Sequence, residues 1–468
     1  MHAYAFEKGR TKMWVTLLSA GQMKSFPPFS PADERYGRPR PRLEPRGKRQ
    51  LQHESSVHST KYRSIGRETC QKKSIRRVKQ KMTDIFVPTD LLAKILIRLP
   101  VKVILKFRCA CKSWCNLISG EYFIDMHLEL AKRSSRMILY PHTPYKPDCA
   151  VKLYSLNKES TADMVFSKSG LDTQGRPIML LNACQGLNLL HSHTDIYVLN
   201  IWTREFARLP QGTPGLSASS SPCQFVGFGF SSTSKKYKVV RLFYYWVDRR
   251  SCTFSMGCEV YTLGGSGRWR EVSPPPYPVH CQGVFSNGAI HWMVDRKICS
   301  GRSVPHVLVS FSVEDETFSL VPLPPCTLTK EHEWTSLFVS EGFLWIVLCN
   351  SRRCTAHLWR LKEYHGGVWT KEHSLSGFKC DVYMVYKGKI LSIDQSYGVL
   401  CHDPKNKTFN RILSLIKGVN YYDPGRRSTR NVWQGASALD VTFHEESLVS
   451  VRDKMRLNSG FQESDRIT

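Results

Sequence analysis

The stretch PTDLLAKILIRLPVKVILKFRCACKSWCNLISGEYFIDMHL, residues 88–128, decides how the first folded part of this chain is built. Apolar residues recur at helical spacing from Leu91 to Leu99, and Pro100 ends that run. A second helix is expected from Val101, and a third segment around Trp114 carries apolar residues on one side. The pattern therefore predicts a small unit of three helices.

This helical unit is too small to bury all of its apolar side chains. Domains below about 40 residues usually need help to fold, and a large exposed apolar patch usually marks an interaction site. We therefore expect a partner protein to cover part of the helices. The alternative is a helical subdomain that packs only against its own chain.

The order of these residues resembles the F-box. The matching positions are Val87-Pro88, Leu91-Leu92 with Ile95-Leu96, Leu99 to Lys102, Arg108-Cys109 with Lys112 to Trp114, Leu117-Ile118, Phe123 and His127. The resemblance implies docking onto the Skp-type adaptor of a cullin-RING ubiquitin ligase, with an apolar helix face entering a groove of the partner. The residues it implies for adaptor contact are Pro88, Leu91, Leu92, Ile95, Leu96, Leu99, Pro100, Val101, Leu105, Cys109, Lys112 and Trp114.

Basic residues are concentrated before the helical unit. The formal net charge of the chain is +28, and residues 1–81 hold 20 Lys and Arg against 6 Asp and Glu, which is half of that excess. The same segment is rich in proline and has few periodic apolar residues, so we expect it to be disordered. Two clusters, Arg46 to Arg49 and Lys72 to Lys81, fit nuclear import signals, nonspecific nucleic-acid contacts or a solvated tail. Because F-box proteins of this layout commonly begin near Met82, residues 1–81 also fit an upstream extension without selected function.

Beyond residue 136 the apolar pattern changes to short strands separated by turns. A recurring unit ends in an aromatic residue and often a proline-containing exit, and the aromatics Phe206, Trp269, Phe318, Trp369 and Phe409 are separated by 63, 49, 51 and 40 residues. That spacing lies near the kelch period of about 50 residues and predicts a degenerate kelch-like β-propeller. Further hairpin turns are expected at Asn287-Gly288, Glu341-Gly342 and Lys387-Gly388. A β-sandwich built from similar hairpins is the alternative fold.

The β-domain also resembles the F-box-associated domain of plant F-box proteins, sometimes described as F-box/kelch. The segments that carry this resemblance are 182–190 (NACQGLNLL), 227–230 (GFGF) with 236–242 (KYKVVRL), 283–292 and 385–391. The predicted organisation is a disordered basic extension (1–81), an F-box (82–130), an F-box-associated β-domain (131–452) and a C-terminal tail (453–468).

Two polar segments of the β-domain, Gln211 to Pro222 and Lys417 to Gly435, are expected to be loops on a propeller rim. The second holds aromatic and arginine residues, which are enriched at binding hot spots. We therefore predict target contact by Tyr421, Tyr422, Arg427 and Trp433.

Catalytic and metal-binding motifs are not found. Cys401-His402-Asp403 are adjacent strand residues that point to opposite faces, so they fit a strand end entering a turn rather than a triad. The sixteen cysteines show no paired Cys-x-x-Cys spacing and read as reduced, mostly buried thiols. No metal or cofactor is expected, since no ligand set is suggested by spacing. No membrane span is expected, since no run of 18 apolar residues is present.

These features predict a non-catalytic, cytoplasmic or nuclear, substrate-recognition subunit of a ubiquitin ligase. The helices would dock the Skp-type adaptor, and through it the cullin and RING subunits, while the β-domain would bind an unknown protein target. The alternative is a basic β-propeller that associates with nucleic acid or chromatin and uses its helices for another partner.

Overall fold

A computed structural model describes residues 88–142, 150–156, 162–171, 178–215, 224–248, 250–296, 298, 306–325, 334–350, 353–364, 366–376, 380–394, 399–413, 420–423, 428–431 and 438–455. The chain divides into two compact units, Met1–Thr89 and Asp90–Thr468. Only Pro88 and Thr89 of the first unit are described, so the predicted disorder of residues 1–81 lies outside the described residues. The fold below is that of the second unit.

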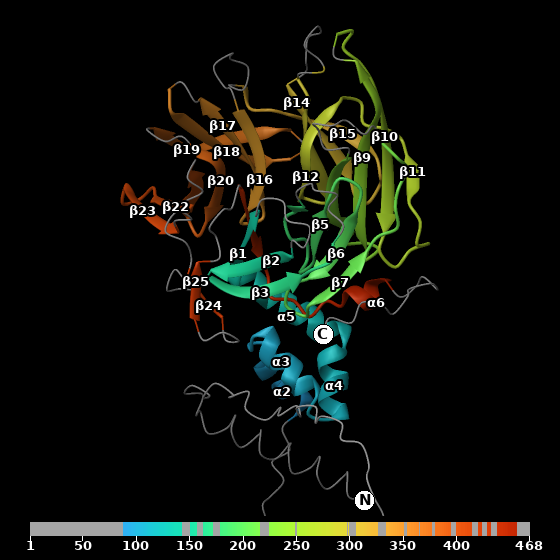
Figure 1. Cartoon of the computed structure of the whole chain (residues 1–468), viewed down its shortest axis with the longest axis vertical. Coiled ribbons are helices and arrows are strands. Elements are labelled where there is room, and N and C mark those ends of the chain that lie inside the picture. The colour runs from blue at the N-terminus through green and yellow to red at the C-terminus, as the bar shows by residue number, and fades with distance from the viewer. Residues whose placement is uncertain are drawn as a thin grey trace, which may run out of the picture. The chain divides into compact units, whose positions relative to one another are not determined.

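Three helices form where the apolar spacing predicts them, and a fourth, Glu121–Ala131, was not predicted. The bounds are α2 (Thr89–Leu96), α3 (Val101–Arg108), α4 (Lys112–Ser119) and α5 (Glu121–Ala131), followed by a short 3₁₀ turn, η1 (Lys132–Ser134). Pro100 separates α2 from α3, since its ring fixes an extended backbone that suits the residue before a helix. Figure 1 shows these helices gathered at one end of a β-domain.

The β-domain consists of four-stranded antiparallel sheets. Its strands are β1 (Arg136–His142), β2 (Val151–Leu156), β3 (Ala162–Lys168), β4 (Met179–Leu180), β5 (Asn188–His191), β6 (Ile196–Asn200), β7 (Glu205–Arg208), β8 (Gln224–Phe230), β9 (Tyr237–Asp248), β10 (Thr253–Thr262), β11 (Arg270–Val272), β12 (Val279–Ser286), β13 (Ala289–Val294), β14 (Val307–Ser312), β15 (Phe318–Pro322), β16 (Trp334–Ser340), β17 (Phe343–Asn350), β18 (Thr355–Glu363), β19 (Val368–Ser376), β20 (Cys380–Tyr386), β21 (Lys389–Asp394), β22 (Val399–Asp403), β23 (Thr408–Leu413), β24 (Asn420–Asp423), β25 (Ser428–Asn431) and β26 (Ala438–His444). In the described residues they form six four-stranded sheets and one two-stranded sheet, β24-β25.

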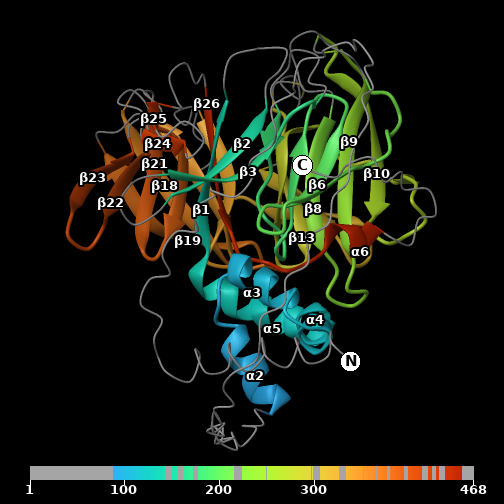
Figure 2. The same cartoon turned by 60° about the horizontal axis from the view of Figure 1, so that its bottom comes forward.

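The six sheets are the blades of a propeller. Five of them use four consecutive strands, and the first strands of neighbouring blades contact one another at the centre, as β8 does with β12 and β16 with β20. The sixth has the order β26-β1-β2-β3, so the last strand of the domain closes the ring beside the first. Figure 2 shows the blades behind the helices. The predicted propeller is confirmed, and the β-sandwich alternative is wrong.

The predicted repeat marks the outer edge of the blades. Four of its aromatics lie on the fourth strands β7, β15, β19 and β23, and Trp269 directly precedes the fourth strand β11. The three predicted hairpin turns join the first and second strands of their blades, and both residues of each turn have positive φ, for example 51° at Asn287 and 74° at Gly288. A fourth such turn, Gln185-Gly186, was not predicted.

A C-terminal segment ties the helices to the propeller. Leu128 of α5 shares one buried cluster with Leu187, Val449 and Val451. Asn200 donates hydrogen bonds to the carbonyl oxygens of Ser447 and Val449, at 3.0 and 2.8 Å. Helix α6 (Val451–Met455) packs beside β7, and it runs past the predicted domain boundary at residue 452 because Met455 is buried.

One predicted loop contains a hairpin. Within Lys417 to Gly435, strands β24 and β25 pair antiparallel, with Tyr421 opposite Arg430 and Tyr422 opposite Thr429. The composition of this segment predicted a loop, and that prediction was wrong for residues 420–423 and 428–431. Strand formation here depends on the pairing of the two segments, which the composition of either one alone does not indicate. Arg427 and Trp433 lie outside the described residues.

Candidate adaptor-binding site

The helical unit has its own apolar core. Leu96, Val101 and Trp114 are buried in it, and the ring of Trp114 meets that of Phe107 edge to face with centroids 5.2 Å apart. These three residues were predicted to contact the adaptor. Because their side chains are buried within the chain, we expect them to shape the site by holding the helices together.

Apolar side chains remain exposed on α2 after this core is formed. Leu91 is 52% exposed and Ile95 is 42% exposed, and residues four apart share one face of a helix. Of the other predicted contact residues, the half-buried ones are Leu92, Leu99 and Leu105, and the exposed ones are Pro88, Pro100, Cys109 and Lys112. Helix α2 thus presents exposed apolar side chains of the kind found at the core of an interface.

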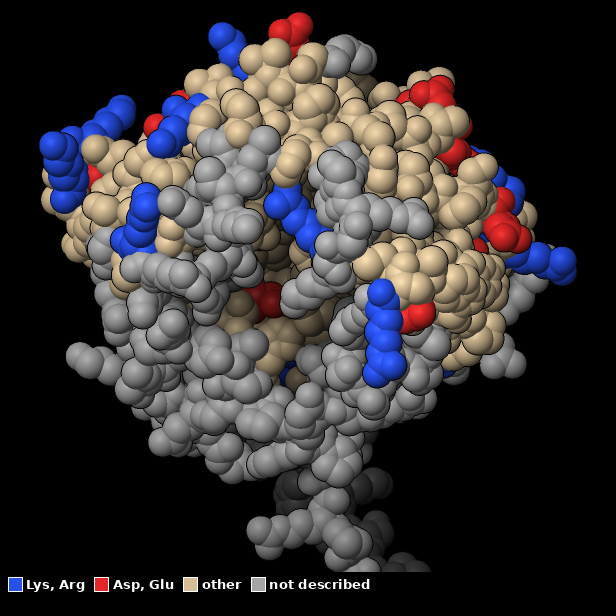
Figure 3. All heavy atoms as spheres, turned by 90° about the horizontal axis from the view of Figure 1, so that it is seen from above, with Lys and Arg blue, Asp and Glu red and all other residues tan. Residues whose placement is uncertain are grey.

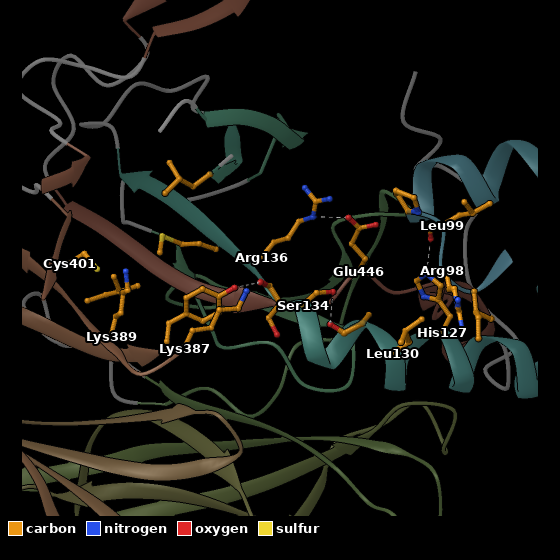
Figure 4. A pocket seen from close by; sticks show the side chains of 18 residues that line it. Arg98, Leu99, His127, Leu130, Ser134, Arg136, Lys387, Lys389, Cys401 and Glu446 are labelled. Carbon is orange, nitrogen blue, oxygen red and sulfur yellow. Dashed lines mark hydrogen bonds and ion pairs between the residues drawn. The ribbon is translucent and has the colours of Figure 1, made fainter. Parts of the chain in front are cut away.

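A pocket of about 690 Å³ lies beside the α2–α3 turn, between the helical unit and the propeller. Its wall includes Arg98 and His127 from the helical unit, and Lys387 and Glu446 from the propeller (Figure 4). Burial lowers the pKa of His127, although the Leu99 carbonyl and Glu446 act in the opposite direction. The ring is therefore neutral near pH 7, and its Nε2 lies 3.3 Å from the Leu99 carbonyl oxygen, to which it donates.

The predicted target contacts lie in rim segments of the propeller. Seen from above, the described part of the propeller is hollowed at the centre, and Lys and Arg side chains are interspersed with Asp and Glu around it (Figure 3). On the described part of this face, the mixture leaves no continuous basic stripe of the kind that binds nucleic-acid backbone (Figure 3). Of the predicted target residues, Tyr421 and Tyr422 lie on β24, while Arg427 and Trp433 lie outside the described residues, so target contact by this set stays a prediction.

The other predicted rim segment, Gln211 to Pro222, is anchored where it begins. The Thr213 N–H donates to Glu259 at 3.1 Å, and Arg241 donates to the Thr213 carbonyl oxygen at 2.7 Å. Sequence reasoning also missed an exposed aromatic pair, Tyr245 and Trp246, near the end of the long β9–β10 hairpin. The run YYWVDRR at 244–250 was an available signal, because exposed aromatic and arginine residues are typical of binding surfaces.

The residues considered for catalysis have structural roles. His402 stacks on Phe409 with ring centroids 4.1 Å apart, and Asp403 accepts hydrogen bonds from the backbone of Lys405 and Asn406, as a residue at a turn does. The described part of the chain holds no group of three His, Cys, Asp or Glu side chains placed to bind a metal.

The described cysteines are free, as predicted. Only Cys184, Cys258 and Cys349 among them are buried, so the prediction that the thiols are mostly buried was wrong for the described cysteines. Among the described helices, none is long and apolar enough to cross a membrane.

Comparison with known families agrees with this architecture. A family model described as the F-box domain matches residues 87–125, and one described as the F-box associated beta propeller domain matches residues 145–455. The chain belongs to the F-box proteins that carry an F-box-associated β-propeller domain.

Similar proteins include F-box proteins of Arabidopsis thaliana. The F-box/LRR-repeat protein At2g43260 is 29% identical over 301 residues, which cover 61% of this chain and 66% of that protein. The F-box protein CPR1 is 26% identical over 306 residues, covering 61% of this chain and 72% of its own length. A designed protein, Ika8, aligns with 58% of this chain and 73% of its own at 12% identity, but a TM-score of 0.30 supports no conclusion.

Proposed function

We propose that this chain is the substrate receptor of a cullin-RING ubiquitin ligase and docks a Skp-type adaptor through its helices. The observation that carries the proposal is the exposed pair Leu91 and Ile95, which remains on the surface after the helical core is filled. Each side chain is about half exposed, so burying the rest of it in a partner groove would contribute roughly 1 kcal/mol, about half of the value for a fully exposed side chain. The match to the F-box family supports this choice of partner.

In this role the chain itself performs no chemistry. The propeller would hold a target protein while the helices hold the ligase, so that lysines of the target meet the charged conjugating enzyme at a high effective concentration. We place this activity in the cytoplasm or the nucleus, where such a ligase would find its targets. The target surface is proposed to lie on the rim that carries β24, β25 and the anchored segment after Gln211.

The test is the double substitution of Leu91→Ala and Ile95→Ala in the full chain. Affinity for the purified Skp-type adaptor should fall about ten- to thirtyfold, since about 0.7–1 kcal/mol of apolar burial is lost at each position. Stability should change little, because substitution of an exposed side chain usually alters it by about 0.5 kcal/mol or less. Calorimetric titration and thermal unfolding would measure the two effects.

The matched control is Tyr122→Ala on α5, which removes a larger side chain that is 76% exposed and lies outside the predicted contact set. Adaptor binding by this variant should equal that of the parent. If the double variant on α2 binds as tightly as the control, adaptor docking through this face is refuted.

A further inference from the structure

Glu446 joins the helical unit to the propeller. It follows strand β26 by two residues, and its Oε2 accepts a hydrogen bond from the Val101 N–H at 2.9 Å. Its Oε1 lies 2.7 Å from Nε of Arg136, the first residue of β1. Figure 4 shows the Glu446 side chain between Arg136 and the α2–α3 turn. The Glu446 side chain is only 14% exposed, whereas Arg136 is 46% exposed, so the carboxylate is largely sheltered from water and the arginine is not.

Helix α3 needs an acceptor at this position. The first N–H groups of a helix have no partner within the helix, and the N-cap residue usually supplies one with its side chain. Here the N-cap is Pro100, which makes no side-chain cap hydrogen bond. A carboxylate at a helix N-terminus also interacts favourably with the helix dipole. Glu446 therefore does the work of the missing cap from 345 residues away in the sequence.

Closure of the propeller brings Glu446 to that place. Strand β26 pairs with β1 over its whole length, with Arg136 opposite His444. The chain leaving β26 therefore passes beside Arg136, and the ion pair holds Glu446 there. β26 is the last strand of the propeller in chain order, so the cap on α3 depends on the pairing of the first and last strands.

The same turn is held from its other side. His127 of α5 donates to the Leu99 carbonyl oxygen, while Glu446 accepts from the Val101 N–H, so the residues on both sides of Pro100 are fixed. The α2–α3 turn thus has one fixed contact within the helical unit and one with the propeller.

We infer that Glu446 is a positioning residue that sets the direction in which the helices, and the adaptor bound to them, face relative to the propeller. The link to an adaptor rests on the proposed function, whereas the link between α3 and the propeller does not. Both can be tested on the full chain with Glu446→Ala, which removes both contacts, and Glu446→Gln, which keeps an oxygen for the Val101 N–H. The control is Glu372→Ala, which removes a carboxylate paired with Arg360 at 2.7 Å on an outer strand.

Hydrogen exchange tests the structural part. In Glu446→Ala the amides of residues 101–104 should exchange about fivefold faster, the size of effect expected when a helix loses its N-cap. Glu446→Gln should restore most of the protection, and Glu372→Ala should leave these amides unchanged. Equal protection in the parent and in Glu446→Ala would overturn the inference.

Ubiquitin transfer tests the positioning part. A short epitope inserted between Arg250 and Ser251, in the turn after β9, would capture an epitope-binding antibody fragment as a probe target of known affinity. With adaptor, cullin and RING subunits present, Glu446→Ala should bind adaptor and probe as the parent does, yet modify the probe's lysines at least about threefold more slowly or in a broader distribution. If amide exchange at α3 is faster but the rate and the sites of ubiquitin transfer to the probe are unchanged, the positioning role is refuted and Glu446 acts only as a cap on α3. Failure of the parent to bind adaptor would instead refute the proposed function.

Discussion

A buried ion pair, Arg241 with Glu259, shows how much a single residue can matter in this fold. The two side chains are 7% exposed, and Arg241 Nη1 lies 2.7 Å from Glu259 Oε2. Replacing Glu259 with leucine removes the carboxylate that Arg241 Nη1 contacts, while the arginine stays charged and buried. We expect the free energy of unfolding to fall by about 3–5 kcal/mol, measured by chemical denaturation.

The control for this prediction is the same substitution at an exposed pair. Glu129→Leu removes a carboxylate that is 68% exposed and pairs with Lys132 on the surface, so stability should change by less than about 1 kcal/mol. Adding Arg241→Leu to Glu259→Leu should recover part of the loss, because no uncompensated charge then remains. A cost at Glu259 no larger than that at Glu129 would contradict the prediction.

At the scale of elements, consecutive blades are joined by a repeated tryptophan contact. Trp269 Nε1 donates to the Pro210 carbonyl oxygen, and Trp369 Nε1 donates to the Pro322 carbonyl oxygen, each at 2.7 Å. Both prolines lie where the fourth strand of the preceding blade ends. This explains why the sequence repeat pairs a closing aromatic residue with a proline-containing exit.

Trp369→Phe should therefore destabilise the propeller. The substitution keeps most of the buried ring but removes the N–H, which leaves the prolyl carbonyl without this donor. A suitable comparison is Trp359→Phe, because the indole N–H of Trp359 is buried and has no hydrogen-bond partner in the described structure. Unfolding of Trp369→Phe should be easier by about 1 kcal/mol than that of Trp359→Phe. Equal losses would show that the hydrogen bond contributes nothing.

Elements were predictable where the signal is local. The apolar period of α2 and the glycine of each hairpin turn act on residues next to them, so the helix and the three turns were found. The turn at Gln185-Gly186, where Gln185 has a φ of 46°, was missed because the strand before it, β4, has only two residues, so no alternating run leads into the turn. The pairing of Tyr421 with Arg430 also left no local signal that outweighed the polar composition around it.

At the scale of the whole molecule, sequence reasoning reached the fold class but not its closure. The pairing of β1 with β26 joins residues about 300 positions apart, and no periodicity records such a contact. Glu446 was missed for the same reason, since its partners Val101 and Arg136 become neighbours only in the closed ring. For the candidate site, the helices and the predicted contact set followed from the motif, whereas which of its leucines are buried depended on how the helices pack.

Acid should destabilise the whole propeller through its buried histidines. Burial lowers the pKa of His191, His291 and His444 to about 4 in each case. The unfolded chain binds a proton at each of them below about pH 6.5, while the folded chain does so only near pH 4. The stabilisation from the three neutral histidines is therefore fully present above about pH 6.5. It is lost as the pH falls from about 6.5 to about 4, and these histidines cause no further loss below about pH 4. Each histidine accounts for about 3 kcal/mol of the loss.

Urea denaturation at pH 7 and pH 5 measures this effect, and His291→Gln separates it from general acid sensitivity. His291 contacts the Val284 carbonyl oxygen and the Tyr364 hydroxyl at 3.1 Å each, so its replacement should weaken the fold at pH 7. The slope of stability against pH should nevertheless become shallower by about one proton near pH 5, because one group no longer titrates on unfolding. A slope identical to that of the parent would show that His291 is protonated in the folded chain, and would contradict the buried, neutral state from which the prediction starts.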